Sequence, residues 1–470
     1  MRARAGPDRN RVIAPRTPGR PGGRIGRLRC VTTSDEQLHL LLFFSPVGRN
    51  RSTWRRPGSG VEQLYGLEGA HYSARRAEEA KLDAVFFADQ VFFGDIGPNP
   101  ELISYEPITT MAALSSVTRR IGLIGTISTT FSEPYNVARM LAQLDFLSDG
   151  RAGWNVVTSF DGAQNFGVPL PDKDERYRRA EDFLRACIAI WDAWEDDAVV
   201  LDRERGVWAD TARIHQPDYR GEYHAVRDAI ALPRSPQGRP VIAQAGQSPD
   251  GRRLAARHAE IVFTAQVDRD SAIEFRDSIA SLAREEGRER PLVLPGLIPV
   301  IGDTREDAER ILAELGATVQ PEIALATLSE LLVGADLEGL DLDEPIPEER
   351  LTTLEQAAAS RKSSATRYPA LRQLIIDERP TLRELLTTRA HSYGHQVVVG
   401  TASDVADRIE DWFRAGACDG FTLTPAYMPE GLDRICDDLV PELQRRGLFR
   451  TEYPGTTLRD TLGLQRPATP

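Results

Sequence analysis

The pattern of apolar and polar positions is most regular between residues 121 and 167. Apolar runs over 121–127 and 152–157 are each followed by hydroxyl residues, as is typical where buried strands end. Between the two runs, apolar residues recur at a helical spacing after Pro134, and this stretch ends at Gly150. The segment therefore predicts strand, helix and strand, with polar side chains at both strand ends. The apolar face of the helix is expected to consist of Val137, Met140, Leu141 and Leu144.

The same alternation of strand and helix patterns extends along most of the chain. Amphipathic patterns such as 176–194 and 405–414 predict helices between the strands. Strands that alternate with helices form parallel sheets, and eight such units close into a barrel with functional side chains at the carboxyl ends of the strands. We therefore predict an α/β fold, a single (β/α)8 TIM barrel over residues 31–470. Its eight expected strands cover 38–44, 82–87, 121–127, 152–157, 241–245, 261–264, 292–301 and 420–424.

Two long stretches interrupt this alternation. Residues 198–238 are rich in Trp, Tyr, His and Pro and predict a small β-type insertion, whereas 303–395 carries helical patterns with no obvious strand. Connections at the carboxyl-terminal face of a barrel can grow without disturbing its core. We therefore expect both insertions at that face, where they shape the substrate pocket, the longer one as a lid. The polar tail from Arg445 to Leu464 is expected to wrap a neighbouring subunit.

The basic residues of the chain are concentrated at its start. Residues 1–29 carry nine arginines and a single acid, Asp8, among prolines and glycines, a composition that cannot bury a core. We expect residues 1–30 to be a disordered basic tail or a mis-assigned start, with the native chain beginning at Val31. An arm for nucleic acid or for targeting is the alternative interpretation.

Composition narrows the class of protein. A net charge of −12 over 470 residues argues against a general affinity for nucleic acid or for anionic membranes. No apolar run approaches the roughly 18 residues needed to span a bilayer, and the amino terminus lacks the apolar core of a secretory signal. We expect a cytoplasmic enzyme that acts on a small molecule, without a membrane or nucleic-acid partner. The four dispersed cysteines, Cys30, Cys187, Cys418 and Cys436, are expected to be reduced thiols, and we predict no metal site.

Three groups at predicted strand ends are candidates for chemistry. Asp89 follows the second strand, where a carboxylate is costly unless it has a function or a salt-bridge partner. Gly246 and Ser248 combine a glycine turn with a helix start, which suits a phosphate, although Ser248 as a plain helix cap is equally compatible. Tyr177 lies in the first turn of a helix that faces the end of the fourth strand, where a packing role is the alternative.

Other catalytic templates match the chain poorly. There is no G-x-S-x-G nucleophile motif. Paired acids for glycoside hydrolysis stay open, with Glu106, Glu133 and Asp161 near strand ends, although nothing pairs them at a defined distance. The chain has few well-placed acid–base groups, and it has a candidate phosphate site. Together these features indicate that a cofactor supplies the chemistry.

Seven segments, in this order along the chain, carry a family resemblance: AKLDAVFFAD, LDFLSDGRAGWNVVTS, NFG, ERYRRAED, AQAGQSPDGR, VVVGTASDVADRIEDWF and PELQRRGLFRTEYPGTTLRDTLG. From about Leu38 to Leu464 the chain resembles the bacterial luciferase-like superfamily, in the group of nitrilotriacetate monooxygenase component A, dibenzothiophene-sulfone monooxygenase and pristinamycin synthase. The resemblance implies a two-component monooxygenase that uses reduced FMN (FMNH2) and O2 to oxygenate a small organic substrate at a C–S, C–N or carbonyl group. A separate NAD(P)H:flavin reductase and a homodimer or homotetramer are also implied.

The resemblance further implies which residues bind the flavin, while it assigns no catalytic residue. Two departures from the family stand out: Lys173 replaces a histidine, and the GRN sequence at 48–50 stands where relatives often have a pair of histidines near the substrate. The alternatives are a deazaflavin-dependent hydride-transfer enzyme of the same superfamily and a non-catalytic flavin-binding protein. The implied residues are Asp89 and Thr126 at the isoalloxazine ring, Lys173, Tyr177, Gly246 and Ser248 at the phosphate, and Thr129, Asn155 and Gln244 lining the same cavity.

Overall fold

The computed structural model describes residues 37–93, 105–360, 368–389, 392 and 394–469. The expected basic tail and the expected start at Val31 lie outside the described residues. Most of the barrel and all nine of the predicted flavin-binding residues lie inside them.

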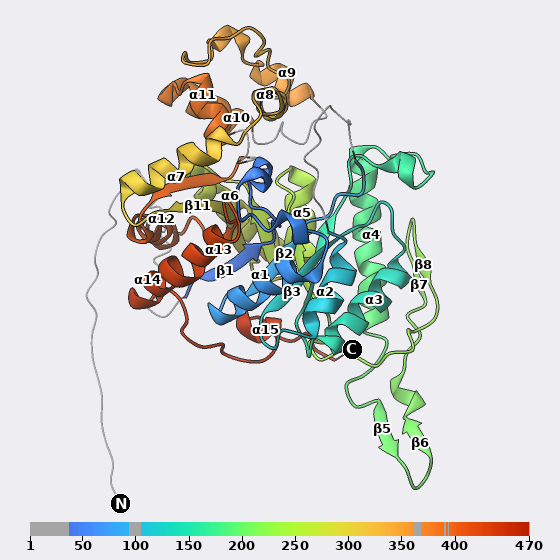
Figure 1. Cartoon of the computed structure of the whole chain (residues 1–470). Helices are drawn as coiled ribbons and strands as arrows, with labels where there is room; N and C mark the ends of the chain where they lie inside the picture. Colours follow the sequence, from blue (N-terminus) through green and yellow to red (C-terminus); the bar gives the residue numbers. More distant parts are fainter. Residues whose placement is uncertain (1–36, 94–104, 361–367, 390–391, 393, 470) are drawn as a thin grey trace, which may run out of the picture. The chain divides into compact units, whose positions relative to one another are not determined.

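The described residues contain a closed ring of eight parallel strands with helices around it, so the predicted TIM barrel is confirmed (Figure 1). Around the ring the order is β10-β9-β4-β3-β2-β1-β13-β11, and pairing of β10 with β11 closes it. All eight lie within about two residues of the ranges that the sequence predicts. The strands are β1 His39–Phe43, β2 Ala84–Phe87, β3 Gly122–Ser128, β4 Ala152–Val157, β9 Val241–Gln244, β10 Ile261–Thr264, β11 Leu292–Ile301 and β13 Gly420–Leu423.

The outer helices form where apolar residues repeat at helical spacing, and polar side chains cap several of their starts. The Asp172 carboxylate caps α4 and the Ser248 hydroxyl caps α5. In α3 the expected apolar face is correct except at Met140, which is 38 % exposed, because the buried stripe is centred on Val137 and Leu141. These helices are α1 Leu67–Glu79, α2 Pro107–Ser115, α3 Pro134–Leu147, α4 Lys173–Trp191, α5 Pro249–His258, α6 Arg269–Glu285, α12 Ala402–Arg414, α13 Glu430–Arg434, η8 Ile435–Leu439 and α14 Val440–Arg445.

The carboxyl-terminal tail packs against its own barrel, and the expectation that it wraps a neighbouring subunit stays a prediction. The tail forms a short helix, α15 Leu458–Thr461, whose Leu458 and Leu462 are buried in one cluster with the inward-facing residues Leu41 and Ile124. Burying these two leucines removes apolar surface from water at the amino-terminal end of the barrel. The tail reads as polar because some of its buried residues are themselves polar, among them Arg450 and Arg459.

The sequence prediction missed a ninth strand, β12 Gln396–Gly400, which pairs with residues 297–301 of β11. β11 is ten residues long, so its second half extends beyond the ring and offers a free edge. Residues 303–395 are helical where described: α7 Arg305–Ala317, α8 Pro321–Leu331, α9 Leu354–Ala359, α10 Tyr368–Glu378 and α11 Leu382–Glu384.

This helical insertion has a hydrophobic cluster of its own, which includes Leu328, Leu332 and Tyr368. Its α7 end is bonded to the loop that follows β1, since Asn50 Nδ2 donates to the Leu315 carbonyl at 3.1 Å. It therefore borders the carboxyl-terminal face, as predicted. Among the described residues no single helix is long and apolar enough to cross a membrane, and α7 with α8 meets that length and composition only when joined across a 101° bend.

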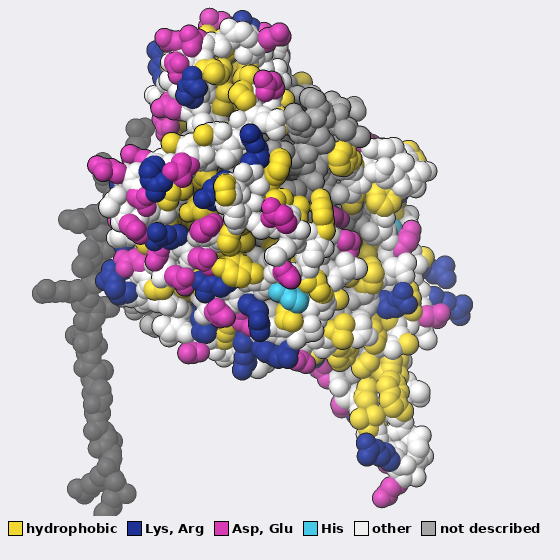
Figure 2. All heavy atoms as spheres, viewed as in Figure 1, with side chains coloured by type: hydrophobic (Ala, Val, Ile, Leu, Met, Phe, Trp, Pro, Cys, Tyr) yellow, Lys and Arg dark blue, Asp and Glu magenta, His cyan; other side chains and the backbone are white. Residues whose placement is uncertain are grey.

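The 198–238 insertion is β-type, as predicted, with the hairpins β5 Val199–Asp202 with β6 Val207–Ala209 and β7 Tyr219–Arg220 with β8 Ala225–Val226. It follows helix α4 rather than a strand, so it joins the barrel at the amino-terminal ends of the strands. Its β7–β8 hairpin then runs back along α4, where the Tyr223 hydroxyl accepts a hydrogen bond from Arg178 Nε near the helix start. The expectation that the insertion shapes the pocket stays a prediction. Figure 2 shows hydrophobic side chains along the β5–β6 arm, where Leu201 and Trp208 are exposed.

A buried ion cluster ties the starts of β11 and β13. The Asp419 carboxylate accepts hydrogen bonds from Arg276 Nη2 at 2.7 Å, from Arg290 Nη2 at 2.9 Å and from the Val293 backbone N–H at 2.8 Å. Burial acts to raise the pKa of Asp419, but the two guanidinium groups outweigh it and lower that pKa below its ordinary value.

We predict that Asp419→Asn lowers the free energy of unfolding by about 3 kcal/mol at pH 7, because it leaves buried arginines without their anion. The folded-state pKa lies below the unfolded value of about 3.9, so the stabilisation is complete above that value and is lost as the pH falls through the folded-state pKa. Urea denaturation between pH 7 and pH 3 measures both effects.

The matched control is Asp411→Asn, which breaks an exposed ion pair with Arg269 and should cost less than about 1 kcal/mol. A loss at Asp419 that does not shrink on acidification would show that the ion cluster is not the source of its stability.

Candidate functional site

The upper layer of the barrel interior is aromatic. Phe43 at the end of β1 lies 5.9 Å, between ring centroids, from both Phe86 of β2 and Phe263 of β10. The His395 ring stacks on Phe263 at 5.1 Å, above Gly296, where a Cβ would lie 2.3 Å from the histidine Nδ1. These rings form an apolar floor under the carboxyl-terminal mouth. Sequence reasoning missed it, although strand runs ending in Phe were the available signal.

A hydrogen-bonded pair of predicted residues borders this floor. Thr126 and Asn155 are opposite each other in the β3–β4 register, and Asn155 Nδ2 donates to Thr126 Oγ1 at 2.9 Å. The threonine hydroxyl in turn donates to the Phe87 carbonyl at 2.8 Å. Asn155 Oδ1 is buried and has no hydrogen-bond partner within the described part of the chain. A buried acceptor left open in this way is suited to a ligand N–H or O–H.

Asp89 lies directly after β2 and is partly exposed. Its carboxylate accepts from the Gln90 N–H at 2.8 Å, and within the described ranges no arginine forms an ion pair with it. Burial raises the pKa of Asp89, and the charge of Glu106 raises it further. The described residues therefore do not support the salt-bridge interpretation of Asp89, which lies near the mouth as a carboxyl group with an upward-shifted pKa.

Two of the three acids considered for glycoside hydrolysis have local roles. Glu106 caps α2 by accepting from the Ile108 and Thr109 N–H groups, and Asp161 accepts from the Gly162 N–H. Glu133 precedes α3 without a side-chain cap hydrogen bond.

Three of the residues assigned to a phosphate form one cradle. Ser248 Oγ lies 3.3 Å from the Tyr177 hydroxyl and accepts from the Gly251 N–H at the start of α5. The Gly246 N–H donates to Gln244 Oε1 at 2.7 Å, and a Cβ at Gly246 would lie 3.2 Å from the Tyr177 oxygen. Hydroxyl groups, a helix start and a glycine without a side chain suit a phosphate. Ser248 thus acts as a helix cap and also faces the cradle.

Two predicted residues lie differently from expectation. Lys173 begins α4, but its side chain is 53 % exposed and its Nζ lies 3.8 Å from Asp250 Oδ2. Thr129 donates both its N–H and its hydroxyl to the Val157 carbonyl, which joins the ends of β3 and β4. Lys173 therefore shares its charge with a carboxylate beside the cradle, and Thr129 links the ends of β3 and β4. The roles of both residues toward a flavin stay predictions.

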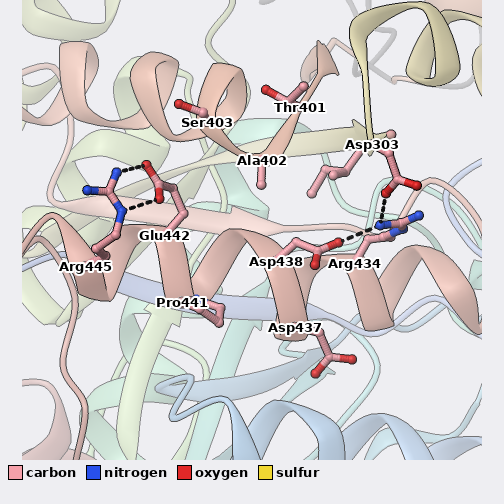
Figure 3. Close-up of a pocket in the computed structure, with 12 residues that line it drawn as sticks. Asp303, Thr401, Ala402, Ser403, Arg434, Asp437, Asp438, Pro441, Glu442 and Arg445 are labelled. Atoms are coloured by element: carbon pink, nitrogen blue, oxygen red, sulfur yellow. Dashed lines mark hydrogen bonds and ion pairs between the residues drawn. The ribbon is translucent and has the colours of Figure 1, made fainter.

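A separate groove of about 450 Å³ lies outside the barrel, between the end of β11, the start of α12 and the η8–α14 helix (Figure 3). Its charged side chains pair with one another: Arg434 with Asp303 and Asp438, and Arg445 with Glu442. We therefore place the functional site at the barrel mouth and not in this groove.

Similar sequences and structures show to which protein family this barrel belongs. Residues 52–419 match the family model of luciferase-like monooxygenases. The chain belongs to the luciferase-like monooxygenase family. The predicted family and the predicted class of enzyme, a monooxygenase, are thereby confirmed.

Three similar members of the family cover nearly the whole chain. N-acetyl-S-(2-succino)cysteine monooxygenase of Bacillus subtilis (strain 168) is 40% identical over 93% of this chain and 99% of its own. Nitrilotriacetate monooxygenase component A of Aminobacter aminovorans is 38% identical over 92% and 98%. A crystal structure of riboflavin lyase with modified FMN superimposes with a TM-score of 0.78 and 31% identity, over 92% and 97%.

We predict that Thr126→Val lowers the free energy of unfolding by about 1–3 kcal/mol, since it leaves the Asn155 amide and the Phe87 carbonyl without their shared hydroxyl. Thr126→Ser keeps that hydroxyl and should retain most of the stability. Urea denaturation of the two variants compares them directly. Equal stability of Thr126→Val and the wild type would mean that this hydrogen-bonded pair does not organise the site.

Proposed function

We propose that this family member is the oxygenase component of a two-component system. A separate NAD(P)H:flavin reductase supplies reduced FMN, and the enzyme combines it with O2 and a small organic substrate. One oxygen atom enters the substrate and the other leaves as water, while the flavin is oxidised. The observation that carries the proposal is the phosphate cradle at Tyr177, Gly246 and Ser248 beside an aromatic barrel floor.

The residues at the mouth fit FMN along its whole length. The cradle would hold the phosphate through the Tyr177 and Ser248 hydroxyls, while Gln244 fixes the turn by accepting from the Gly246 N–H. The open acceptor Asn155 Oδ1 would take a hydrogen bond from the flavin ring, with Asp89 and Thr126 at the ends of the neighbouring strands. When bound, reduced flavin supplies the electrons that activate O2. The aromatic floor excludes water from the reacting face, which suppresses unproductive loss of the activated oxygen.

The names of the two relatives favour oxidation at sulfur or nitrogen. N-acetyl-S-(2-succino)cysteine is a thioether and nitrilotriacetate is a tertiary amine. We therefore propose a substrate whose C–S or C–N group is oxygenated. We prefer this reaction to the carbonyl oxidation that the family resemblance also allows.

The test is oxygen uptake by the purified protein with chemically reduced FMN and either of these two compounds as probe. We expect a product that requires both reduced FMN and O2 and that is absent with oxidised FMN. Product formation from a reduced deazaflavin without O2 would instead establish hydride transfer. Flavin binding without any product from either probe would favour the non-catalytic alternative.

We further predict that Tyr177→Phe and Ser248→Ala each weaken FMN binding by about 1 kcal/mol or more, because each removes a hydroxyl from the cradle. Quenching of flavin fluorescence on titration measures the affinity. Tyr72→Phe and Ser116→Ala are the matched controls, since both hydroxyls lie on outer helices and bond to groups away from the mouth. An unchanged FMN affinity in both cradle variants would show that the phosphate does not bind at this position.

A further inference from the structure

The loop that follows β1 is strongly basic in an acidic protein. Residues 45–61 contain four arginines, Arg49, Arg51, Arg55 and Arg56, and no acid, whereas the whole chain carries −12. The loop begins at the carboxyl end of β1 and therefore at the mouth of the barrel. Such a local concentration of positive charge attracts anions to the mouth.

The GRN sequence in this loop gives each of its three residues a separate role. Gly48 has φ 105°, and a Cβ there would lie 2.4 Å from the Tyr427 Cα, so the close approach requires glycine. Asn50 is structural, because its Oδ1 accepts from the Ser52 N–H and its Nδ2 donates to the Leu315 carbonyl. Arg49, between them, carries the positive charge of the sequence.

Arg49 extends over the aromatic floor. Its backbone N–H donates to the Pro425 carbonyl at 2.8 Å, which fixes the start of the side chain. Its guanidinium carbon lies 5.4 Å from the centroid of the Phe43 ring, and the residue is partly buried. A guanidinium in this position is held by the ring face and sits where the local dielectric is low.

This cation is distinct from the phosphate cradle. The cradle belongs to the β9 end and to α4, and in the ring β9 is separated from β1 by β4, β3 and β2. Arg49 is therefore on another side of the mouth, across the floor that the flavin ring would cover.

We propose that Arg49 binds a carboxylate of the substrate, and that the enzyme acts on small carboxylic acids with an oxidisable sulfur or nitrogen. The proposal rests on the function proposed above. A guanidinium pairs with a carboxylate through two parallel hydrogen bonds, and this pairing strengthens at a partly desolvated site. The substrates named for the two relatives are both carboxylic acids, which agrees with this choice.

The experiment compares nitrilotriacetate with its trimethyl ester, which keeps the amine and removes the charges. For the wild type we expect turnover of the acid, with kcat/KM falling as salt is added, and little turnover of the ester. Arg49→Met should raise KM for the acid about tenfold or more and leave kcat within about twofold, as expected for a lost charged hydrogen bond outside the chemical step. The KM of Arg49→Lys for the acid should lie between those of the wild type and Arg49→Met, because lysine keeps the charge but not the paired hydrogen-bond geometry.

Two controls separate this effect from others. Arg203→Met removes an exposed arginine from the β5–β6 arm and should change neither KM nor kcat. FMN affinity should stay the same in all the variants, since Arg49 is not part of the cradle.

A binding measurement keeps the test independent of turnover. Calorimetric titration of the protein with nitrilotriacetate and with N-acetyl-S-(2-succino)cysteine should show binding that Arg49→Met weakens about tenfold. Binding of these acids that weakens in Arg49→Met, without oxygen-dependent product, would overturn the proposed function and leave standing only the binding of a carboxylate at Arg49. Equal use of acid and ester, an unchanged KM and affinity in Arg49→Met, or no binding of either acid to the wild type would overturn the inference alone.

Discussion

The position of β13 in the strand ring is the constraint on which the rest of the structure depends. β13 pairs with β1 on one side and with β11 on the other, so its register fixes where both strands end. Asp419 directly precedes β13, and its carboxylate accepts a hydrogen bond from the Val293 N–H of β11. This bond sets the register of β13 at the amino-terminal end of the barrel. A slip of one residue would turn every inward side chain outward and would scatter the aromatic floor.

The two ends of the barrel use polar groups in opposite ways. At the amino-terminal ends the buried carboxylates are fully engaged: Asp83 bonds to Arg450, His39 and the Leu40 N–H, and Asp145 bonds to Gln237. At the carboxyl-terminal ends Asn155 Oδ1 is buried without a partner in the described residues. Buried carboxylates that are engaged in this way make one end rigid, and this rigidity can hold an unsatisfied group at the other, where a ligand would satisfy it.

The sequence predicted what depends on local patterns and failed where partners are distant. The eight strands and the Tyr177–Ser248 cradle were predictable because periodicity, helix starts and glycine turns are properties of short segments. β12 was missed because only the overlong second half of β11 gives it a partner. Lys173 and Thr129 were placed by analogy, whereas their partners, Asp250 and Val157, come from other elements.

The 198–238 insertion follows helix α4 rather than a strand, and composition alone, which correctly predicted its strands, does not reveal this. Its β7–β8 hairpin runs back along α4 as far as Arg178, near the helix start. The β1 loop and the 303–395 helices border the carboxyl-terminal mouth, and Asn50 and Arg55 join them through the Leu315 and Thr318 carbonyls.

The loop that follows β1 therefore takes part both in substrate recognition and in the attachment of the helices that cover the mouth. The loop that fastens the helical insertion is also the loop that holds the Arg49 guanidinium over Phe43. An anion bound at Arg49 would therefore lie beneath the point where the insertion is attached, in the part of the mouth most shielded from water. Shielding strengthens its charged hydrogen bonds, and it also protects an oxygen-activating cofactor, so one loop can serve selectivity and chemistry together.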